Sequence, residues 1–251
     1  MPTSSTPHRT LVIIPAFGES GRVGGVVREI LEFDPALSVA VIDDGSTDDT
    51  AEEARAAGAV VIRHPNNLGY GTALHTGYHY AQRRGYTRVL QMDADGQHEV
   101  AMLPRLVEAL DDGVDVALGS RYLQGSPPPT SLMRRVGTAL FRWIATIGTG
   151  QPITDPTSGF QGLSSKALQA VTHDGFPEDF PDTDVLILLA RQGLELREVP
   201  VRMHERTGGV SMHRGIRIAY YGYKMLITLL LMPVRRKTPF RTPDNVAGGV
   251  A

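Results

Sequence analysis

Two aspartates and an amide stand close together in the segment QMDADGQH, residues 91–98, directly after an apolar run. One residue separates Asp93 from Asp95, and Gln97 follows two positions later. Two carboxylates with no adjacent Lys or Arg repel each other, and a hard divalent cation with oxygen ligands relieves that repulsion. If the strand continues through this segment, alternate side chains share a face, so both aspartates would face one ligand. The segment predicts a metal-assisted site, with turn formation and helix capping as the alternative interpretation.

A second acidic segment, DDGSTD, begins at Asp43. Helix capping explains residues 46–48 well, but it explains Asp43 and Asp44 poorly. A carboxylate at the mouth of a sheet can accept hydrogen bonds from a base or a ribose. The chain lacks the phosphate-cradling loop GxxxxGK[ST], so phosphate charge would fall to the metal and to isolated arginines. Arg121 and Arg206 are the candidates, because a guanidinium matches phosphate oxygens in two directions.

Short apolar runs alternate with helical patterns over the first half of the chain, which predicts βαβ units and a mostly parallel sheet. The expected strands cover residues 11–14, 38–42, 59–63, 88–92 and 114–120. A polar loop follows each of them: IPAFGES, DDGSTDD, NNLGYG, DADGQH and GSRYLQGS. In such sheets the ligand sits beyond the carboxyl ends of the strands. We therefore expect the five loops to form one site.

The pattern changes after Gly125. We expect a helix over 131–148, a loop over 155–163 entering a strand, a helix over 183–192 and a strand over 195–203. Ser20 is a plausible cap of the first helix, and Trp143 is expected in the core. Residues 1–240 would form one domain, with one half over about 10–125, a second half over about 126–215 and a helix over about 215–234. We expect a disordered tail over 241–251.

Composition narrows the partners and the compartment. A net charge of -2 gives no broad attraction to nucleic acid, so we expect no nucleic-acid partner. The chain has no cysteine and no signal-peptide pattern, which favours the cytoplasm. Residues 215–237 form an apolar segment that ends in basic residues, typical of a helix lying on the inner face of a membrane. Packing on its own domain or on a partner subunit is the alternative, and the sequence permits a homo-oligomer.

Six motifs occur in a family-specific order: IPAFGES, VIDDGSTDDT, MDADGQH, GSRYLQGS, DPTSGF and EVPVRMHERTGGVS. Over residues 10–215 the chain resembles family 2 glycosyltransferases of GT-A fold, nearest to the dolichyl- or polyprenyl-phosphate sugar synthases. The resemblance implies a Rossmann-like, mostly parallel α/β sheet flanked by helices, with a C-terminal amphipathic or apolar helix. It also implies these site residues: Pro15, Phe17 and Glu19 beside the nucleotide; Ile42 and Asp44 at the base; Asp93 and Ala94 at the ribose and diphosphate; Asp95 and Gln97 as metal ligands; Arg121 and Arg206 facing phosphate.

The reaction that the resemblance implies is an inverting transfer from a UDP- or GDP-sugar, assisted by Mg²⁺ or Mn²⁺. A polyprenyl-phosphate acceptor is already ionised and needs no general base, whereas a hydroxyl acceptor needs a carboxylate to take its proton. Asp184 falls near the acidic position of the family, with Asp179 and Asp182 as rivals. Two departures concern the phosphate contacts: Met212 and Tyr70 replace basic residues that relatives carry.

Other functions remain as alternatives. One is transfer to a hydroxyl of a glycan or a small molecule. A sugar-1-phosphate nucleotidyltransferase would share the fold and the metal, but its Gly-rich basic loop is missing after LVII. A non-catalytic nucleotide-binding protein is the third alternative, and the intact DADGQ segment argues against it.

Overall fold

The computed structural model of the chain describes residues 9–123, 132–173, 176 and 183–203. Arg206 and Met212, the rival acids Asp179 and Asp182, the apolar segment 215–237 and the tail 241–251 lie outside the described residues.

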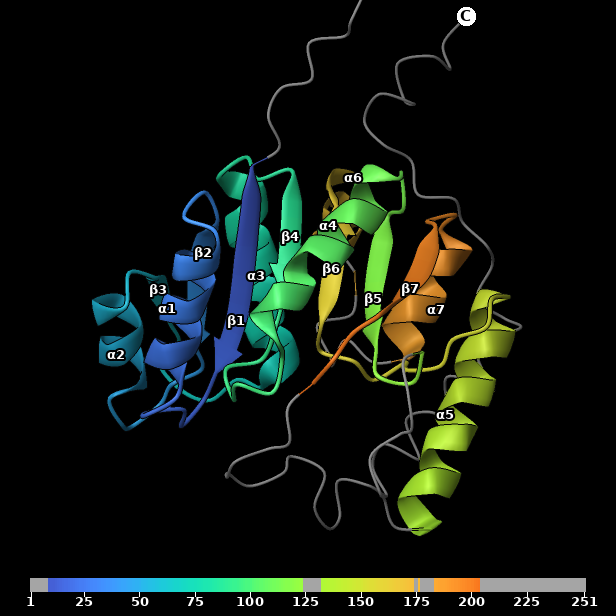
Figure 1. Cartoon of the computed structure of the whole chain (residues 1–251), viewed down its shortest axis with the longest axis horizontal. Helices are drawn as coiled ribbons and strands as arrows, with labels where there is room; N and C mark the ends of the chain where they lie inside the picture. Colours follow the sequence, from blue (N-terminus) through green and yellow to red (C-terminus); the bar gives the residue numbers. More distant parts are fainter. Residues whose placement is uncertain (1–8, 124–131, 174–175, 177–182, 204–251) are drawn as a thin grey trace, which may run out of the picture.

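Seven strands form a single sheet in the described part of the chain, in the order β3-β2-β1-β4-β6-β5-β7 (Figure 1). Their bounds are β1 Thr10–Ala16, β2 Ser38–Asp43, β3 Val60–Arg63, β4 Arg88–Gln91, β5 Val116–Ser120, β6 Gln161–Ser164 and β7 Leu196–Pro200. The prediction of a mostly parallel sheet is confirmed, since β1 pairs in parallel with β2 and β4, β2 with β3, and β5 with β7. Strand β6 is antiparallel to both of its neighbours, β4 and β5.

Helices cover both faces of the sheet. They are α1 Val23–Phe33, α2 Thr50–Ala56, α3 Tyr70–Arg83, α4 Leu103–Asp111, α5 Leu132–Thr149, α6 Ser165–Val171 and α7 Thr183–Arg191, with a short 3₁₀ helix Val100–Met102 before α4. Side chains alternate across β1: Leu11 and Ile13 pack with α3, α6 and α7, whereas Val12 and Ile14 pack with α1, α2 and α4. Strand β1 is therefore apolar on both faces, which explains its continuous apolar run in the sequence.

A glycine follows the end of each of two helices, whereas the predicted cap of the first helix is absent. Gly58 and Gly85 follow the ends of α2 and α3 with φ of 103° and 70°, a left-handed conformation that suits glycine. The prediction that Ser20 caps the first helix is wrong, because the N-cap residue of α1 is Arg22 and makes no side-chain cap bond. The Ser20 hydroxyl instead donates a 2.6 Å hydrogen bond to Glu53 in α2.

Helix α5 packs against α7 and buries Ile144 against Ile187. The expectation that Trp143 lies in the core is wrong, because 57% of this residue is exposed. Leu140 and Ile147, three residues before and four after Trp143, are also about half exposed. One helix face can bury only some of its apolar positions, and the sequence did not show which face meets α7. No helix in the described residues is both long and apolar enough to cross a membrane.

Candidate active site

The loop that follows β1 is tied to the loop that follows β2. The backbone N–H of Gly18 donates to the Ser46 hydroxyl at 3.0 Å, and that of Glu19 donates to the Thr50 hydroxyl at 2.9 Å. Pro15 is buried within β1, whereas 53% of Phe17 is exposed beyond the strand. The three residues assigned to the nucleotide by resemblance thus run from the sheet out to the surface at its carboxyl edge.

Asp44 follows β2 directly and holds the next loop in place. Its carboxylate accepts hydrogen bonds from the backbone N–H groups of Leu68 and Gly69 at 2.9 and 2.8 Å, and lies 2.8 Å from His64 Nδ1. Asp44 is only 3% exposed, and Ile42 is fully buried. Ile42 lies near the carboxyl end of β2 and Asp44 directly follows that strand, and the base-binding role of both residues stays a prediction.

Asp43 and Gly45 explain the rest of the DDGS segment. The Asp43 carboxylate accepts the Ser46 N–H at 3.0 Å and pairs with Arg63 Nε at 3.0 Å. Gly45 has a φ of 76°, and a Cβ there would lie 2.5 Å from the main chain of Asn66. These contacts pack the loops after β2 and β3 tightly together, a structural role for Asp43 that the sequence did not reveal.

The carboxylate of Asp93 is held from two sides. The Tyr70 hydroxyl donates to Oδ1 at 2.9 Å, and His98 Nε2 lies 3.0 Å from Oδ2. The His98 ring stacks on Phe160, with ring centroids 5.0 Å apart. On the side of the DPTSGF segment, Gly159 approaches so closely that a Cβ would lie 2.7 Å from Oδ2. Asp93 is thus fixed in one orientation by neighbours from three loops.

This arrangement also sets the ionisation of Asp93 and Tyr70. Burial alone would raise the pKa of Asp93, but the hydrogen bond and charge of His98, the Tyr70 hydroxyl and the charge of Arg121 lower it overall. Burial raises the pKa of Tyr70 well above its ordinary value, and the negative charge of Asp93 adds to this. Asp93 is therefore an anion at neutral pH, and Tyr70 is a neutral hydrogen-bond donor.

Asp95 and Gln97 lie in a turn rather than on a strand. Strand β4 ends at Gln91, so the argument that alternation along an extended strand aligns Asp93 with Asp95 is wrong. The turn contains Gly96 with a φ of 73°, and the Gln97 N–H donates to the Asp95 carboxylate at 3.1 Å. Ala94 is buried beneath it, whereas Asp95 and Gln97 are partly exposed.

The described residues offer few oxygen ligands for the predicted cation. No group of three or more His, Cys, Asp or Glu in the described residues could hold a metal. Asp95 and Gln97 offer two oxygen donors, and both oxygens of Asp93 already have protein partners. A site with few protein oxygens fits Mg²⁺, because water and substrate phosphates complete the coordination shell of this ion. Mn²⁺ fits for the same reason, since it also prefers oxygen ligands. A four-ligand structural zinc site does not fit these residues.

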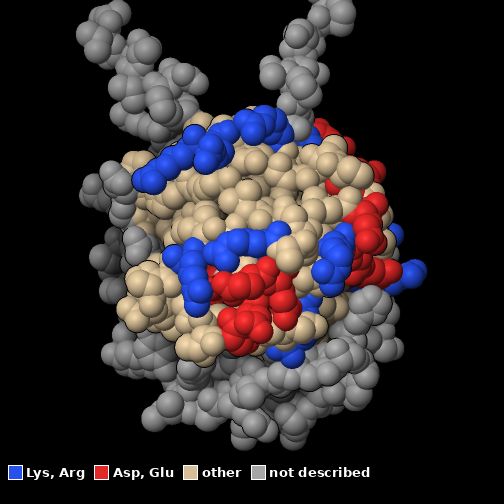
Figure 2. Space-filling view, turned by 90° about the vertical axis from the view of Figure 1, so that its left-hand side faces the viewer, with Lys and Arg blue, Asp and Glu red and all other residues tan. Residues whose placement is uncertain are grey.

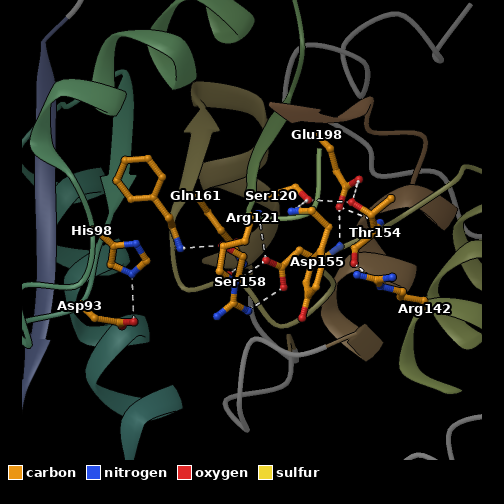
Figure 3. Close-up of polar contacts among 12 residues, drawn as sticks. Asp93, His98, Ser120, Arg121, Arg142, Thr154, Asp155, Ser158, Gln161 and Glu198 are labelled. Carbon is orange, nitrogen blue, oxygen red and sulfur yellow. Dashed lines mark hydrogen bonds and ion pairs between the residues drawn. The ribbon is translucent and has the colours of Figure 1, made fainter. Parts of the chain in front are cut away.

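Arg121, directly after β5, forms a two-pronged pair with Asp155. Its Nε and Nη2 atoms donate to the two carboxylate oxygens at 2.7 and 2.8 Å, and Asp155 is 1% exposed. The bond to Asp155 raises the pKa of Arg121. A guanidinium has five N–H donors, so the pair leaves donors for a phosphate. Figure 3 shows this pair between the Asp93–His98 pair on one side and Thr154, Glu198 and Arg142 on the other.

Asp184 lies in the first turn of α7. Because α7 runs back to the start of β7, which is parallel to β5, the first turn of α7 lies at the carboxyl edge of the sheet with the other loops (Figure 1). The structure thus places every described candidate at one edge of the sheet.

The side of the molecule with α2 and β3 carries acidic and basic side chains next to each other (Figure 2), including Glu52 3.3 Å from Arg55.

Three residues that hold this site had no role in the sequence analysis: His98, Asp155 and Glu198. Tyr70 appeared there only as a replacement for a basic residue. Each of the four stands in or beside a quoted motif, so the motifs were the only available signal. His98 is five residues from its partner Asp93, whereas the partners of Tyr70, Asp155 and Glu198 are far away in the sequence and only the fold brings them together.

Comparison with known proteins identifies the family of this chain. The model of the family "Glycosyl transferase family 2" matches residues 11–172. Polyprenol monophosphomannose synthase of Mycolicibacterium smegmatis is 31% identical over 87% of this chain and 86% of its own length. Undecaprenyl-phosphate mannosyltransferase of Micrococcus luteus is 31% identical over 82% of this chain and 88% of its own length.

Among solved structures, glucosyl-3-phosphoglycerate synthase from Mycobacterium tuberculosis, in complex with Mn²⁺, UDP-glucose and phosphoglyceric acid, is similar with a TM-score of 0.65. It is 22% identical, and the alignment covers 90% of this chain and 80% of that one, so it supports the GT-A-like fold. The family match spans more than half of the chain and contains the DDGS and DADGQ segments. The chain belongs to glycosyl transferase family 2 and is a glycosyltransferase.

Proposed function

We propose that this glycosyltransferase moves a sugar from a UDP- or GDP-sugar to a polyprenyl phosphate, with inversion at the anomeric carbon and with a divalent cation. The observation that supports the proposal is that Asp95 and Gln97, the oriented Asp93 carboxylate and the Arg121 guanidinium all lie at one edge of the sheet. Two relatives of 31% identity bear the names of polyprenyl-phosphate mannosyltransferases, which supports the choice of acceptor.

The nucleotide would lie over the carboxyl ends of β1 and β2. Phe17 provides an exposed ring there, and Glu19 is held by a 2.6 Å pair with Arg22. We assign the base to Ile42 and Asp44, and the ribose and diphosphate to Asp93 and Ala94. Because Asp93 is clamped by Tyr70 and His98, it is oriented before the donor arrives, and the donor does not have to order it.

Asp95 and Gln97 would hold the divalent cation, Mg²⁺ or Mn²⁺, together with oxygens of the donor diphosphate. When bound, the cation neutralises the charge that develops on the leaving nucleoside diphosphate. The solved relative with Mn²⁺ and UDP-glucose supports this choice of cofactor. Asp93 has no such role in our proposal, because hydrogen bonds within the protein already engage both of its oxygens.

Arg121 would donate to the same diphosphate from the other side. Its pair with the buried Asp155 fixes the plane of the guanidinium, and a preorganised charge aimed at a leaving group stabilises the transition state without reorganisation. Arg206 is proposed as a second phosphate contact from the sequence alone.

A polyprenyl-phosphate acceptor carries its own nucleophilic oxyanion, so the reaction requires no general base. For a hydroxyl acceptor, Asp184 is our candidate base, since it lies at the same edge of the sheet. The two acceptor classes therefore make different demands on Asp184. Asp184→Asn should retain most of its activity with a polyprenyl phosphate and lose it with a hydroxyl acceptor.

The test uses the full chain, a panel of labelled UDP- and GDP-sugars, MnCl₂ or MgCl₂, and either undecaprenyl phosphate or undecaprenol. We expect metal-dependent transfer of label into the organic phase with the lipid phosphate only. Chelation by EDTA should abolish it. Transfer to undecaprenol at the same rate, or full activity in EDTA, would contradict the acceptor and the cation respectively.

A further inference from the structure

Two motifs of the chain meet at a single carboxylate. DPTSGF begins at Asp155 and EVPVRM begins at Glu198, and the proposed mechanism gives Glu198 no role. Glu198 lies in β7 and is partly buried, whereas Asp155 is almost completely buried. The Glu198 carboxylate accepts the backbone N–H of Asp155, although the two residues are 43 positions apart in the chain.

Glu198 accepts three hydrogen bonds from one short segment. Its Oε1 accepts the backbone N–H of Thr154 at 2.8 Å and that of Asp155 at 2.7 Å, and its Oε2 accepts the Thr154 hydroxyl at 2.8 Å. On the other side, Arg142 Nε donates to the carbonyl of Thr154. The main chain of residues 154–155 is therefore held at its N–H groups by Glu198 and at a carbonyl by Arg142 (Figure 3).

Fixing the main chain of Asp155 also fixes its carboxylate. That carboxylate binds the guanidinium of Arg121 with two parallel hydrogen bonds, and it accepts the backbone N–H of Arg121 at 3.3 Å. A two-pronged arginine–carboxylate pair is directional, so the plane of one group sets the plane of the other. The orientation of Arg121 thus depends on Glu198 through Asp155.

The register of the sheet makes this relay possible. Strands β5 and β7 pair in parallel, with Leu118 opposite Glu198 and Ser120 opposite Pro200. The Ser120 hydroxyl lies 2.6 Å from that of Thr154, and Arg121 leaves the strand directly after Ser120. Shifting the register by one residue would turn Glu198 to the other face of the sheet and break the relay.

We infer that Glu198 is a positioning residue, which directs the Arg121 guanidinium toward the diphosphate of the donor by holding Thr154 and Asp155. The inference rests on the proposed function, which assigns Arg121 to that diphosphate. Glu198 itself touches no reacting atom. The three hydrogen bonds that its carboxylate accepts come from N–H and O–H groups of residues 154–155, which is the pattern of a structural acceptor rather than of an acid or base.

The test is a double-mutant cycle between positions 198 and 121, with the affinity for UDP and for GDP measured in MnCl₂. Glu198→Ala should weaken binding about tenfold, and Glu198→Gln less, because an amide oxygen can still accept the two backbone N–H groups. With Arg121→Ala already present, Glu198→Ala should change the affinity less than about twofold, since groups that act through one another are not additive. Glu195→Ala, the removal of an exposed acid just before β7, is the matched control and should leave affinity unchanged.

A second readout does not depend on activity. In NMR spectra, the Arg121 Nε–H resonance is assigned by its loss in Arg121→Lys, and in the wild type it should be protected from hydrogen exchange with solvent. In Glu198→Ala this resonance should shift and lose its protection. In Glu195→Ala it should stay unchanged. An unchanged resonance, or additive losses in the cycle, would overturn the inference. If neither UDP nor GDP binds the wild type, the proposed function fails, and the resonance alone decides whether Glu198 positions Arg121.

Discussion

Each acidic residue at the carboxyl edge is distinguished by its partners rather than by its own chemistry. Asp44 holds a loop through Leu68 and Gly69, and Asp93 is clamped by Tyr70 and His98. Asp95, in the following turn, is partly exposed, accepts the Gln97 N–H and is our predicted cation ligand. Carboxylates that look equivalent in the sequence thus have different surroundings, because their hydrogen-bond partners and their exposure differ.

Asp95→Asn should abolish transfer while leaving the fold intact. The amide has no negative charge to attract a divalent cation, so metal-dependent binding of UDP or GDP should fall by a factor of about 100 or more, as expected when a charged ligand is lost. Activity, thermal unfolding and nucleotide titration with and without MnCl₂ provide the measurements. Asp112→Asn, at an exposed position after α4, is the control. Wild-type turnover in Asp95→Asn would remove the metal hypothesis.

Tyr70→Phe should lower kcat/KM about tenfold. The change removes the hydroxyl that donates to Asp93 at 2.9 Å and leaves a partly buried carboxylate with one hydrogen bond fewer, a loss of about 1 kcal/mol or slightly more. Steady-state kinetics with varied donor would measure it. Tyr80→Phe, on the same helix but outside this network, should behave as the wild type. If both variants have the same kinetics, the clamp on Asp93 has no catalytic importance.

At the scale of elements, short segments approach one another so closely that particular side chains are excluded. Gly159 lies against Asp93, and Gly45 lies against the main chain of Asn66. The antiparallel strand β6 between β4 and β5 places the DPTSGF segment beside both Asp93 and Arg121. A strand in this direction was not expected from the βαβ pattern of the first half, which describes local connections and not the pairing of distant strands.

Gly159→Ala should weaken donor binding although it adds only a methyl group. The new Cβ would lie 2.7 Å from an oxygen of Asp93, so the carboxylate has to move away from His98 or Tyr70. Nucleotide affinity and the melting temperature should both fall. Gly137→Ala in α5 is the control, since nothing lies within 4 Å of its Cβ and alanine favours a helix by about 0.5–1 kcal/mol. Equal affinity of the two variants would contradict the close approach.

At the scale of the whole molecule, the described residues form one sheet with helices on both faces and the candidate site at one edge (Figure 1). The surface includes an exposed apolar stripe on α5, formed by Leu140, Trp143 and Ile147. The apolar and basic segment 215–237 adds a second feature, known from its sequence alone. A lipid acceptor would be reached most easily by an enzyme that rests on the bilayer surface.

Deletion from Gly215 onward should reduce association with liposomes that contain anionic lipid. The segment combines an apolar stretch with Arg235, Arg236 and Lys237, and each basic residue near an anionic surface contributes about 1 kcal/mol. Sedimentation with liposomes at low and high salt measures the effect. Nucleotide binding by the truncated chain serves as the control for folding. Equal sedimentation of both chains would count against an interfacial role for the segment.

The sequence by itself determined most of the elements and the sheet edge at which the candidate site lies, although it did not indicate helix α6. Apolar runs of strand length, glycines after helices and polar loops after strands are local signals, and they identified the parallel strands and the edge where Asp93, Asp95 and Arg121 gather. Only the tertiary structure decided the direction of β6, the exposed face of α5 and the partners of each carboxylate. The pairs Tyr70–Asp93, Arg121–Asp155 and Glu198–Thr154 join residues 23, 34 and 44 positions apart. Such contacts leave no local pattern, because they depend on strand order and register.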